Sequence, residues 1–324
     1  MAAPAGTAAI EATAATRDAV LAVSDLHKSY GEREVVRGLS FSIARGECYG
    51  LLGPNGAGKT TTLRLCLGLI EAASGSIDLL GHDIPRDARR ARLRVGVVPQ
   101  MDNLDPDFTA SENLLVYGRY FGIDDATIRT RIPQLLDFAG LSGRADERIQ
   151  TLSGGMKRRL TMARALVNDP DIIFMDEPTT GLDPQARHLI WERLKTLVNQ
   201  GKTLLLTTHF MDEAERLCGR LAIMDNGRII AEGSPRELVR RHIEPEVIEA
   251  FGDGTDAWAK KAAGMSTRVE VTGETVFCYT SDARPLLAAL EGEQGFANGG
   301  LRYMHRPANL EDVFLKLTGR DLRD

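Results

Sequence analysis

The stretch that follows the apolar run Cys48–Leu52 limits the fold of this chain more than any other part of its sequence. Its pattern, G-x-x-x-x-G-K-[ST], is that of a phosphate-binding loop, and helical spacing follows from Lys59 to about Ile70. Such a loop requires a strand before it and a helix after it, because the turn's N–H groups and the helix N-terminus bind phosphate together. The residues expected to bind are Gly53, Pro54, Asn55, Gly56, Ala57, Gly58, Lys59, Thr60 and Thr61.

Three polar side chains of this loop have distinct expected roles. Lys59 should contact the β- and γ-phosphates of a nucleotide, and the Thr60 hydroxyl should hold Mg²⁺. Thr61 is placed to donate to the α-phosphate. The sequence therefore predicts binding of a nucleotide together with Mg²⁺.

A second feature is a pair of carboxylates at the end of the apolar run Ile172–Met175. Ligands of parallel α/β sheets lie at the carboxyl ends of the strands, where Asp176 and Glu177 would sit. Adjacent carboxylates repel each other unless a cation is close. We therefore expect Asp176 to hold Mg²⁺ through its water shell and Glu177 to polarise an attacking water. With the second apolar run, Thr203–Thr207, the pattern predicts an α/β fold whose parallel sheet is covered on both faces.

Further patterns assign the rest of the nucleotide-binding part. Leu39, Phe41 and Ile43 alternate with small residues, which predicts a half-buried strand. Residues from about 105 to 165 are predicted to be mostly helical, with Thr109 and Glu112 forming a capping box. The turn Asn226-Gly227 predicts a β-hairpin.

The chain is predicted to divide into three parts: a flexible tail at 1–20, a nucleotide-binding domain at 21–240 and an accessory domain at 241–324. Residues from about 250 to 265 are interpreted as a glycine-containing connection. Strands at Arg268–Val271 and Val276–Tyr279, with a helix near Asp282–Glu291, then predict a small α/β appendage.

Composition excludes several classes of protein. The net charge of -5 argues against a chain that coats nucleic acid, so no nucleic-acid partner is expected. The four cysteines are widely spaced in the sequence, which predicts reduced thiols. No stretch approaches the roughly 20 apolar residues of a membrane-spanning helix, so the chain is not expected to cross a membrane by itself.

The segment Leu152-Ser153-Gly154-Gly155-Met156 adds a motif that identifies a family. In order with the phosphate loop, Asp176-Glu177 and His209, it closely resembles the nucleotide-binding subunits of ATP-binding cassette (ABC) transporters, over about residues 20–235. The resemblance implies a P-loop NTPase fold: a RecA-like core, an antiparallel β subdomain and a helical signature subdomain. It also implies an ATPase coupled to transmembrane transport.

The resemblance further implies roles for residues around the nucleotide. Tyr30 would stack on adenine, and His209 would contact the γ-phosphate as part of the catalytic site with Glu177. Gln100 would sense Mg²⁺ and the attacking water and relay their state to the membrane partner.

Other implied roles involve a second copy of the chain. Ser153, Gly154 and Gly155 would bind the γ-phosphate of the nucleotide held by the opposite subunit, and Asp183 would lie at the dimer seam. The basic residues Lys157–Arg159 are expected to serve the dimer or the phosphate environment. Met156 stands where many importers carry Gln, which favours the exporter branches.

Two further stretches, Val97–Pro106 and Glu112–Gly122, and the ending Arg306–Leu315 resemble the family of nodulation-factor export ATP-binding proteins. That resemblance implies export of a lipo-chitooligosaccharide, or a similar lipooligosaccharide, through a separate permease of about six spans. Two copies of the subunit would form a homodimer, bound as a peripheral protein at the cytoplasmic face of the inner membrane. Two alternatives are an exporter of hydrophobic, drug-like molecules and a soluble cassette ATPase without a transport role.

Overall fold

The computed structural model describes residues 19–291 and 301–319. The chain forms two compact units, Met1–Glu232 and Gly233–Asp324, which are described separately below. Most of the tail expected at 1–20 lies outside the described residues, and Ala19 and Val20 already belong to the first strand. In the described parts of the chain, no helix combines the length and the apolar character needed to span a membrane.

The first unit begins with an antiparallel sheet of four strands in the order β2-β1-β4-β5. The alternation predicted at Leu39, Phe41 and Ile43 is confirmed, because all three side chains are buried. They pack in one core with residues of the central sheet. The strands are β1 (Ala19–Tyr30), β2 (Arg33–Ala44), β4 (Ser74–Leu79) and β5 (His82–Ile84), and the short helix α3 (Ala88–Arg92) follows.

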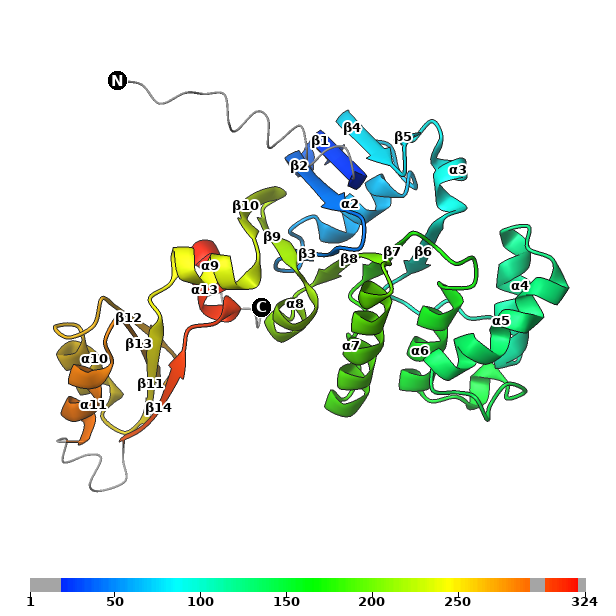
Figure 1. The fold of residues 1–324 in the computed structure, drawn as a ribbon. Helices are drawn as coiled ribbons and strands as arrows, with labels where there is room; N and C mark the ends of the chain where they lie inside the picture. The colour runs from blue at the N-terminus through cyan, green and yellow to red at the C-terminus, as the bar shows by residue number, and fades with distance from the viewer. Residues whose placement is uncertain (1–18, 292–300, 320–324) are drawn as a thin grey trace. The chain divides into compact units, whose positions relative to one another are not determined.

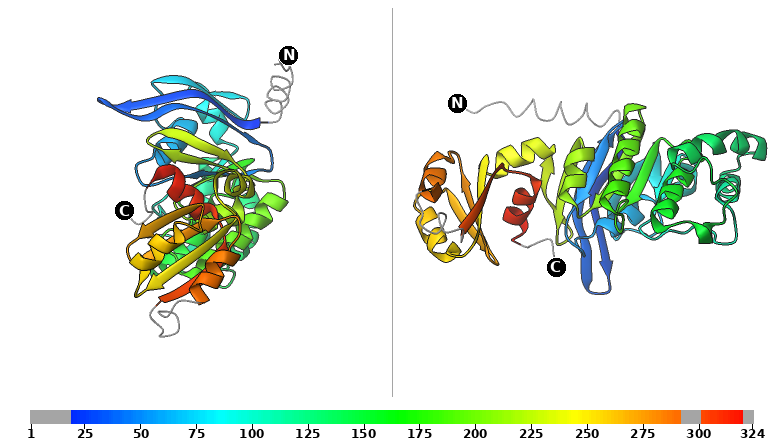
Figure 2. Two further views of the ribbon diagram at one scale, coloured as in Figure 1. Left: turned by 90° about the vertical axis from the view of Figure 1, so that its left-hand side faces the viewer. Right: turned by 90° about the horizontal axis from the view of Figure 1, so that it is seen from below.

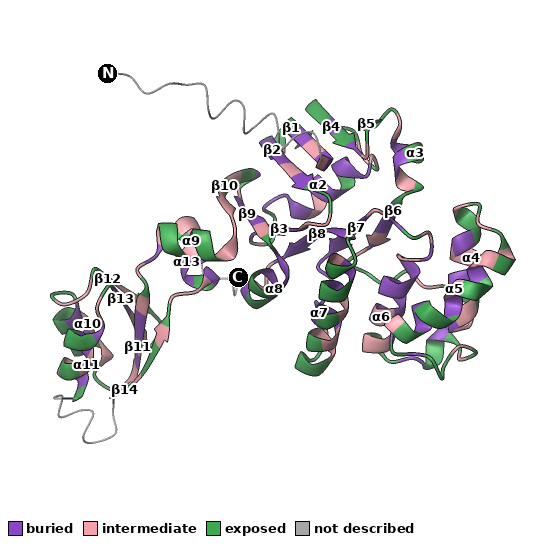
Figure 3. Ribbon diagram, viewed as in Figure 1, coloured by how far each residue is buried: buried purple, intermediate pink, exposed green. Residues whose placement is uncertain are grey.

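The central sheet of this unit has six strands in the order β10-β9-β3-β8-β7-β6 (Figure 1). The pairings β9-β3, β3-β8, β8-β7 and β7-β6 are parallel, as the apolar runs predicted. Every residue of β3, β7 and β8 is buried, which is visible as continuous purple in Figure 3. The strands are β3 (Cys48–Leu52), β6 (Val95–Val98), β7 (Ile172–Asp176), β8 (Thr203–Thr208), β9 (Arg220–Asp225) and β10 (Arg228–Gly233).

Helices complete the first unit. Three of them follow strands of the central sheet: α2 (Lys59–Cys66), α7 (Pro184–Asn199) and α8 (Met211–Leu217). The predicted helical segment is confirmed as α4 (Ala110–Tyr120), α5 (Asp125–Phe138), the 3₁₀ turn η1 (Ile149–Thr151) and α6 (Gly154–Arg164). The helices α4, α5 and α6 gather beside the β6 end of the sheet around an apolar core of their own (Figures 1 and 2). The capping box of Thr109 and Glu112 is present at the start of α4.

The second unit is an antiparallel sheet in the order β12-β13-β11-β14. Along the chain these elements follow in the order β11-α10-β12-β13-α11-β14. The side chains of α10 and α11 share one apolar core with residues of the sheet. A helix precedes this arrangement and another follows it. The elements are α9 (Pro235–His242), β11 (Glu246–Gly252), α10 (Thr255–Ala262), β12 (Arg268–Thr272), β13 (Thr275–Thr280), α11 (Arg284–Glu291), β14 (Leu301–Pro307) and α13 (Leu310–Thr318).

The interpretation of residues 250–265 as a connection is wrong. This segment contains the end of β11, an inner strand of the sheet, and all of α10, whose Trp258 and Ala262 are buried. The glycines that suggested a linker form the tight turn between these elements: Gly252 and Gly254 have φ of 106° and 93°, a left-handed region that glycine enters without steric cost.

The ending Arg306–Leu315 has a structural explanation. Arg306 extends from β14 and donates to both carboxylate oxygens of Asp312, at 2.7 and 2.9 Å, and to Glu249 on β11 at 2.5 Å. Asp312 is 1% exposed, and it also accepts from the Tyr279 hydroxyl and closes the capping box of α13 with Asn309. One bidentate ion pair therefore fixes the last helix to the sheet.

Replacing Arg306 by Met should loosen α13 and β14, because removing one partner leaves the Asp312 charge buried without its cation. Breaking such a pair costs about 3 kcal/mol, so amide exchange in α13 should become faster by on the order of 100-fold. Hydrogen–deuterium exchange of the full chain, followed by mass spectrometry, measures this. The matched control is Arg302→Met, which removes an exposed arginine from the same strand. Equal exchange in the two variants would show that the ion pair does not hold the helix.

Candidate active site

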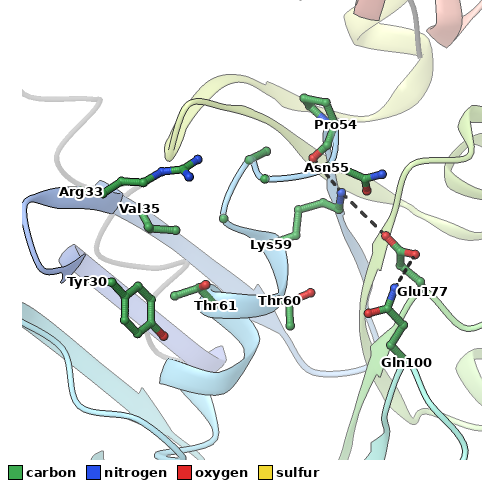
Figure 4. Close-up of a pocket in the computed structure, with 13 residues that line it drawn as sticks. Tyr30, Arg33, Val35, Pro54, Asn55, Lys59, Thr60, Thr61, Gln100 and Glu177 are labelled. Atoms are coloured by element: carbon green, nitrogen blue, oxygen red, sulfur yellow. Dashed lines mark hydrogen bonds and ion pairs between the residues drawn. The ribbon is translucent and has the colours of Figure 1, made fainter. Parts of the chain in front are cut away.

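The loop between β3 and α2 forms one wall of a cavity of about 330 Å³ (Figure 4). Two of its glycines are required by close neighbours. A Cβ atom at Gly53 would lie 2.4 Å from the Met224 carbonyl oxygen, and one at Gly58 would lie 2.8 Å from that of Val35. The loop is therefore held against the ends of neighbouring strands, with its backbone bordering the cavity. The lining residues are Tyr30, Arg33, Val35, Pro54, Asn55, Gly56, Ala57, Gly58, Lys59, Thr60, Thr61, Gln100 and Glu177.

Lys59 places a cation at the centre of this loop. Its side chain is 5% exposed, and Nζ donates to the carbonyl oxygens of Gly53 at 2.6 Å and Pro54 at 3.1 Å. Nζ also lies 4.0 Å from Oε1 of Glu177. Burial lowers the pKa of Lys59, while the charges of Glu177 and Asp176 act in the opposite direction. An ammonium group in this position can bind an anion that enters the cavity.

Asp176, at the end of β7, accepts hydrogen bonds from two threonine hydroxyls. Thr60 Oγ1 donates to its Oδ1 at 3.0 Å, and Thr207 Oγ1 donates to the same oxygen at 2.5 Å. The pair of Asp176 and Thr60 presents a carboxylate and a hydroxyl oxygen, which are ligands of the kind that Mg²⁺ takes in nucleotide sites. The donor set therefore fits this ion.

Glu177 has a backbone conformation that is uncommon for a residue with a side chain, with φ of 47°. Such a conformation costs on the order of 1–3 kcal/mol and persists where the surroundings enforce it. Here the Glu177 N–H donates to the carbonyl and hydroxyl oxygens of Thr207, both at 3.1 Å. The turn directs the carboxylate to the edge of the cavity.

Several polar groups surround that carboxylate. Gln100 Nε2 and Thr180 Oγ1 donate to Glu177 Oε2, both at 3.2 Å, and His209 Nδ1 lies 3.2 Å from Oε1. The contact with His209 lowers the pKa of Glu177, and the Lys59 charge acts in the same direction against partial burial. Glu177 is therefore a carboxylate at neutral pH, and its two oxygens are oriented by Gln100 after β6, His209 after β8 and Thr180 of its own turn.

Tyr30 lies at the opposite end of the cavity from Glu177 (Figure 4). It is 50% exposed at the end of β1, and the Lys28 ammonium lies over its ring, 5.2 Å from the centroid. Arg33 and Val35 also line this end, and sequence reasoning did not identify them. Arg33 lies near Tyr30 because the register of the β1-β2 hairpin pairs the two residues, and no spacing in the sequence gives that register.

The signature residues do not belong to this cavity. Ser153 is the N-cap of α6 and accepts from the Met156 N–H at 3.3 Å, while Gly154 and Gly155 begin the helix. Asp183 caps α7 by accepting from the Ala186 N–H at 2.9 Å. Ser153, Gly154 and Asp183 are exposed. Within a single chain, the site thus contains the loop, Tyr30, Gln100, Asp176, Glu177 and His209. Ser153, Gly154, Gly155 and Asp183 do not line its cavity.

The comparisons with known proteins agree with this geometry. A family model described as "ABC transporter" matches residues 36–180, and the model "Nodulation factor export protein NodI, C-terminal domain" matches residues 256–319. The protein "Nod factor export ATP-binding protein I" of Ralstonia nicotianae is 61% identical over 94% of this chain and 95% of its own. The chain belongs to the ABC transporter family. The protein of the same name from Paraburkholderia xenovorans is also 61% identical, over 95% of this chain and 99% of its own.

Solved structures extend the likeness to the fold of this ABC subunit. An ATP-binding subunit of an ABC transporter is 32% identical, with a TM-score of 0.63 over 68% of this chain and 92% of that one. A dimeric ATP-binding cassette in a post-hydrolysis state, bound to ADP and Pi, is 28% identical, with a TM-score of 0.61 over 66% and 98% of the two chains. The expected P-loop fold is thus confirmed, and the chain is an ATPase coupled to transport.

The basic residues Lys157–Arg159 of this ABC subunit differ in position. Arg158 is 4% exposed, so the expectation of a contact across the dimer is wrong for this residue, while its guanidinium donates to the carbonyl of Glu177 behind the expected phosphate site. The reason is helical geometry: position 158 lies on the side of α6 that faces the strand ends. No signal in the spacing separates Arg158 from its two basic neighbours.

Proposed function

We propose that the cavity binds ATP with its phosphates against the loop Gly53–Thr61 and its adenine on Tyr30. The observation that carries this proposal is the position of Glu177, whose carboxylate lies beside Lys59 at the phosphate end of the cavity. Lys59 would bind the β- and γ-phosphates in place of the loop carbonyls that it contacts here. An ammonium–phosphate contact joins two opposite charges, so it is stronger than the ammonium–carbonyl contact that it replaces.

Mg²⁺ would be held by the Thr60 hydroxyl and, through water, by Asp176, with Gln100 at the edge of the site. When bound, the ion would neutralise charge on the β- and γ-phosphates. Thr207 fixes Asp176 from the neighbouring strand, so the carboxylate is already oriented toward Thr60.

Glu177 and His209 would form the catalytic pair. The lowered pKa keeps Glu177 ionised, so it can accept a hydrogen bond from the attacking water and polarise it toward the γ-phosphate. His209 and Gln100 each hold one carboxylate oxygen of Glu177, which restricts the positions that this water can take. His209 would also contact the γ-phosphate.

A second copy of the chain would complete the site. Ser153, Gly154 and Gly155 stand at the exposed N-terminus of α6, where backbone N–H groups and the helix dipole favour an anion. We propose that they bind the γ-phosphate of ATP held by the opposite subunit, with Asp183 at the seam. Asp183, the N-cap of α7, would lie at the contact between the two subunits.

A permease would dock at a groove of about 290 Å³ beside α4. The groove is lined by Asn103, Asp105, Pro106, Phe108, Asn113, Val116, Tyr117, Tyr120 and Arg164. Tyr120 is 78% exposed there, and Met101, which directly follows Gln100, is 79% exposed. A partner seated on these two apolar side chains would contact the segment that carries Gln100. In this proposal the subunit would lie at the cytoplasmic face of the inner membrane, beside a separate permease of about six spans.

The proposed cargo is a lipo-chitooligosaccharide of the Nod-factor type or a similar amphipathic lipooligosaccharide. The support is the name shared by relatives that match both units of the chain, Nod factor export ATP-binding protein I. A hydrophobic drug is the alternative cargo, and a soluble ATPase without a transport partner is the alternative role.

Inverted membrane vesicles test both cargo and role. Vesicles from cells of the source organism, with the gene deleted or restored, are given ATP and a radiolabelled N-acylated chitooligosaccharide. We expect ATP-dependent accumulation only when the wild-type gene is restored, and none with Glu177→Gln. Accumulation of daunorubicin instead would favour the drug exporter. If neither compound accumulates, and the Glu177→Gln protein purifies from detergent-solubilised membranes in ATP without a multi-span partner, the soluble ATPase is favoured.

A further inference from the structure

Three polar side chains on one side of the signature helix α6 are buried: Arg158, Thr161 and Arg164 are 4%, 0% and 5% exposed. They recur every third residue, so they form one stripe along the helix. Thr161 Oγ1 donates to Asp102 at 3.2 Å, and Arg164 donates to the carbonyl and side-chain oxygens of Asn103. The stripe thus fastens α6 to the segment that follows β6, which carries Gln100.

Arg158 differs from the other two because it reaches a second strand. Its Nη1 donates to the carbonyl oxygens of Pro99 at 2.5 Å and Gln100 at 3.3 Å. Its Nη2 donates to those of Asp176 at 3.2 Å and Glu177 at 3.0 Å. Its Nε donates to that of Pro178 at 2.7 Å. One guanidinium therefore joins the backbone after β6, which carries Gln100, to the backbone after β7, which carries Glu177.

We infer that Arg158 is a positioning residue for ATP hydrolysis: its guanidinium fixes the backbone of Glu177 and Gln100 relative to each other and to the signature helix. This inference rests on the proposed function, because it requires Glu177 to act on the attacking water. Arg158 itself is not among the residues that line the cavity, and it touches no reacting group.

The chemistry of the contact explains why an arginine stands here. A guanidinium has five N–H donors in a fixed plane, and Arg158 uses all three of its nitrogens on carbonyl oxygens. A lysine has three donors on one atom and cannot span two strand ends in this way. The strained turn at Glu177 is held from both sides, by Thr207 at its N–H and by Arg158 at its carbonyl.

The position on α6 has a consequence for the dimer. Ser153 begins this helix and Arg158 lies five residues further on, so both move as parts of one rigid element. A shift of α6 that accompanies contact between Ser153 and the partner's ATP would be passed by Arg158 to Glu177, which faces the subunit's own ATP. Arg158 would thereby link the two nucleotides of the dimer.

The test compares Arg158→Lys with Arg131→Lys in the full chain. Arg131 is a partly buried arginine of the same helical segment that donates to one carbonyl, that of Val167, and lies away from the cavity. We expect Arg158→Lys to lower kcat by about 10- to 100-fold, since small displacements of a catalytic group have effects of that size. The Kd for labelled ATP should stay within about twofold, and Arg131→Lys should change neither quantity.

A combined variant separates positioning from an independent contribution. If Arg158 acts through Glu177, adding Arg158→Lys to Glu177→Gln should lower the single-turnover rate by less than about threefold, because coupled effects are not additive. The full 10- to 100-fold effect in that background would overturn the inference, as would an unchanged kcat in Arg158→Lys alone. If the Arg158→Lys protein does not fold, Arg158→Gln is tested in its place. Failure of both to bind labelled ATP would assign Arg158 to folding and also overturn the inference. A wild-type rate in Glu177→Gln alone would instead refute the proposed function.

Discussion

Replacing Glu177 by Gln should lower kcat for ATP hydrolysis by about 10²- to 10⁴-fold, the range expected when a general base is removed. The amide keeps the size of the side chain and can still contact Gln100 and Thr180. It has lost the negative charge that attracts a proton of the attacking water. The contact with His209 also weakens, because the neutral amide no longer offers the negative charge that His209 and Lys59 stabilise in Glu177.

ATP binding should survive this change, because the phosphates are held by the loop and Lys59. The measurements are the steady-state rate of phosphate release and the Kd for labelled ATP, on the same preparations. Glu192→Gln is the matched control, since it makes the same chemical change on an exposed part of α7. Equal rates in Glu177→Gln and Glu192→Gln would remove Glu177 from the catalytic pair.

The sequence predicts those parts of this molecule in which local pattern and tertiary structure agree. Ile172–Met175 and Thr203–Thr207 are continuous apolar runs, and they form strands buried on both faces. The G-x-x-x-x-G-K-T pattern identifies its turn because close neighbours at Gly53 and Gly58 exclude every other residue type there. In these cases the residue types themselves carry the signal, even where the neighbours that require them, as at Gly53 and Gly58, are distant in the sequence.

The features that the sequence did not predict depend on contacts between distant residues. Arg158 is one of three adjacent basic residues, and only the placement of α6 against two strand ends makes it buried. Arg33 lines the cavity because of the register of a hairpin. The turn at Gly252 and Gly254 resembled a linker because β11 gains its stability from two neighbouring strands that come later in the sequence. Neither the burial of one arginine among three basic residues nor the register of a hairpin can be obtained from spacing alone.

Replacing Lys59 by Ala should abolish nucleotide binding at ordinary concentrations. Truncating one member of a buried, charged contact costs about 2–5 kcal/mol, which corresponds to a Kd for ATP that is weaker by roughly 30- to several-thousand-fold. Two effects add here. The phosphates lose their cation, and the carbonyl oxygens of Gly53 and Pro54 lose the donor that holds the loop in shape.

The matched control is Lys202→Ala, which removes a lysine that pairs with Asp169 at a distance from the cavity. Titration with labelled ATP should give a wild-type Kd for this control and no saturable binding for Lys59→Ala. Circular dichroism on both proteins checks that the fold is retained. Near-normal affinity in Lys59→Ala would mean that the backbone N–H groups of the loop and the dipole of α2 hold the phosphates alone. The role of Lys59 would then be limited to its hydrogen bonds with the carbonyl oxygens of the loop. This result would refute the proposed contact between Lys59 and the phosphates, but not the binding of a nucleotide in the cavity.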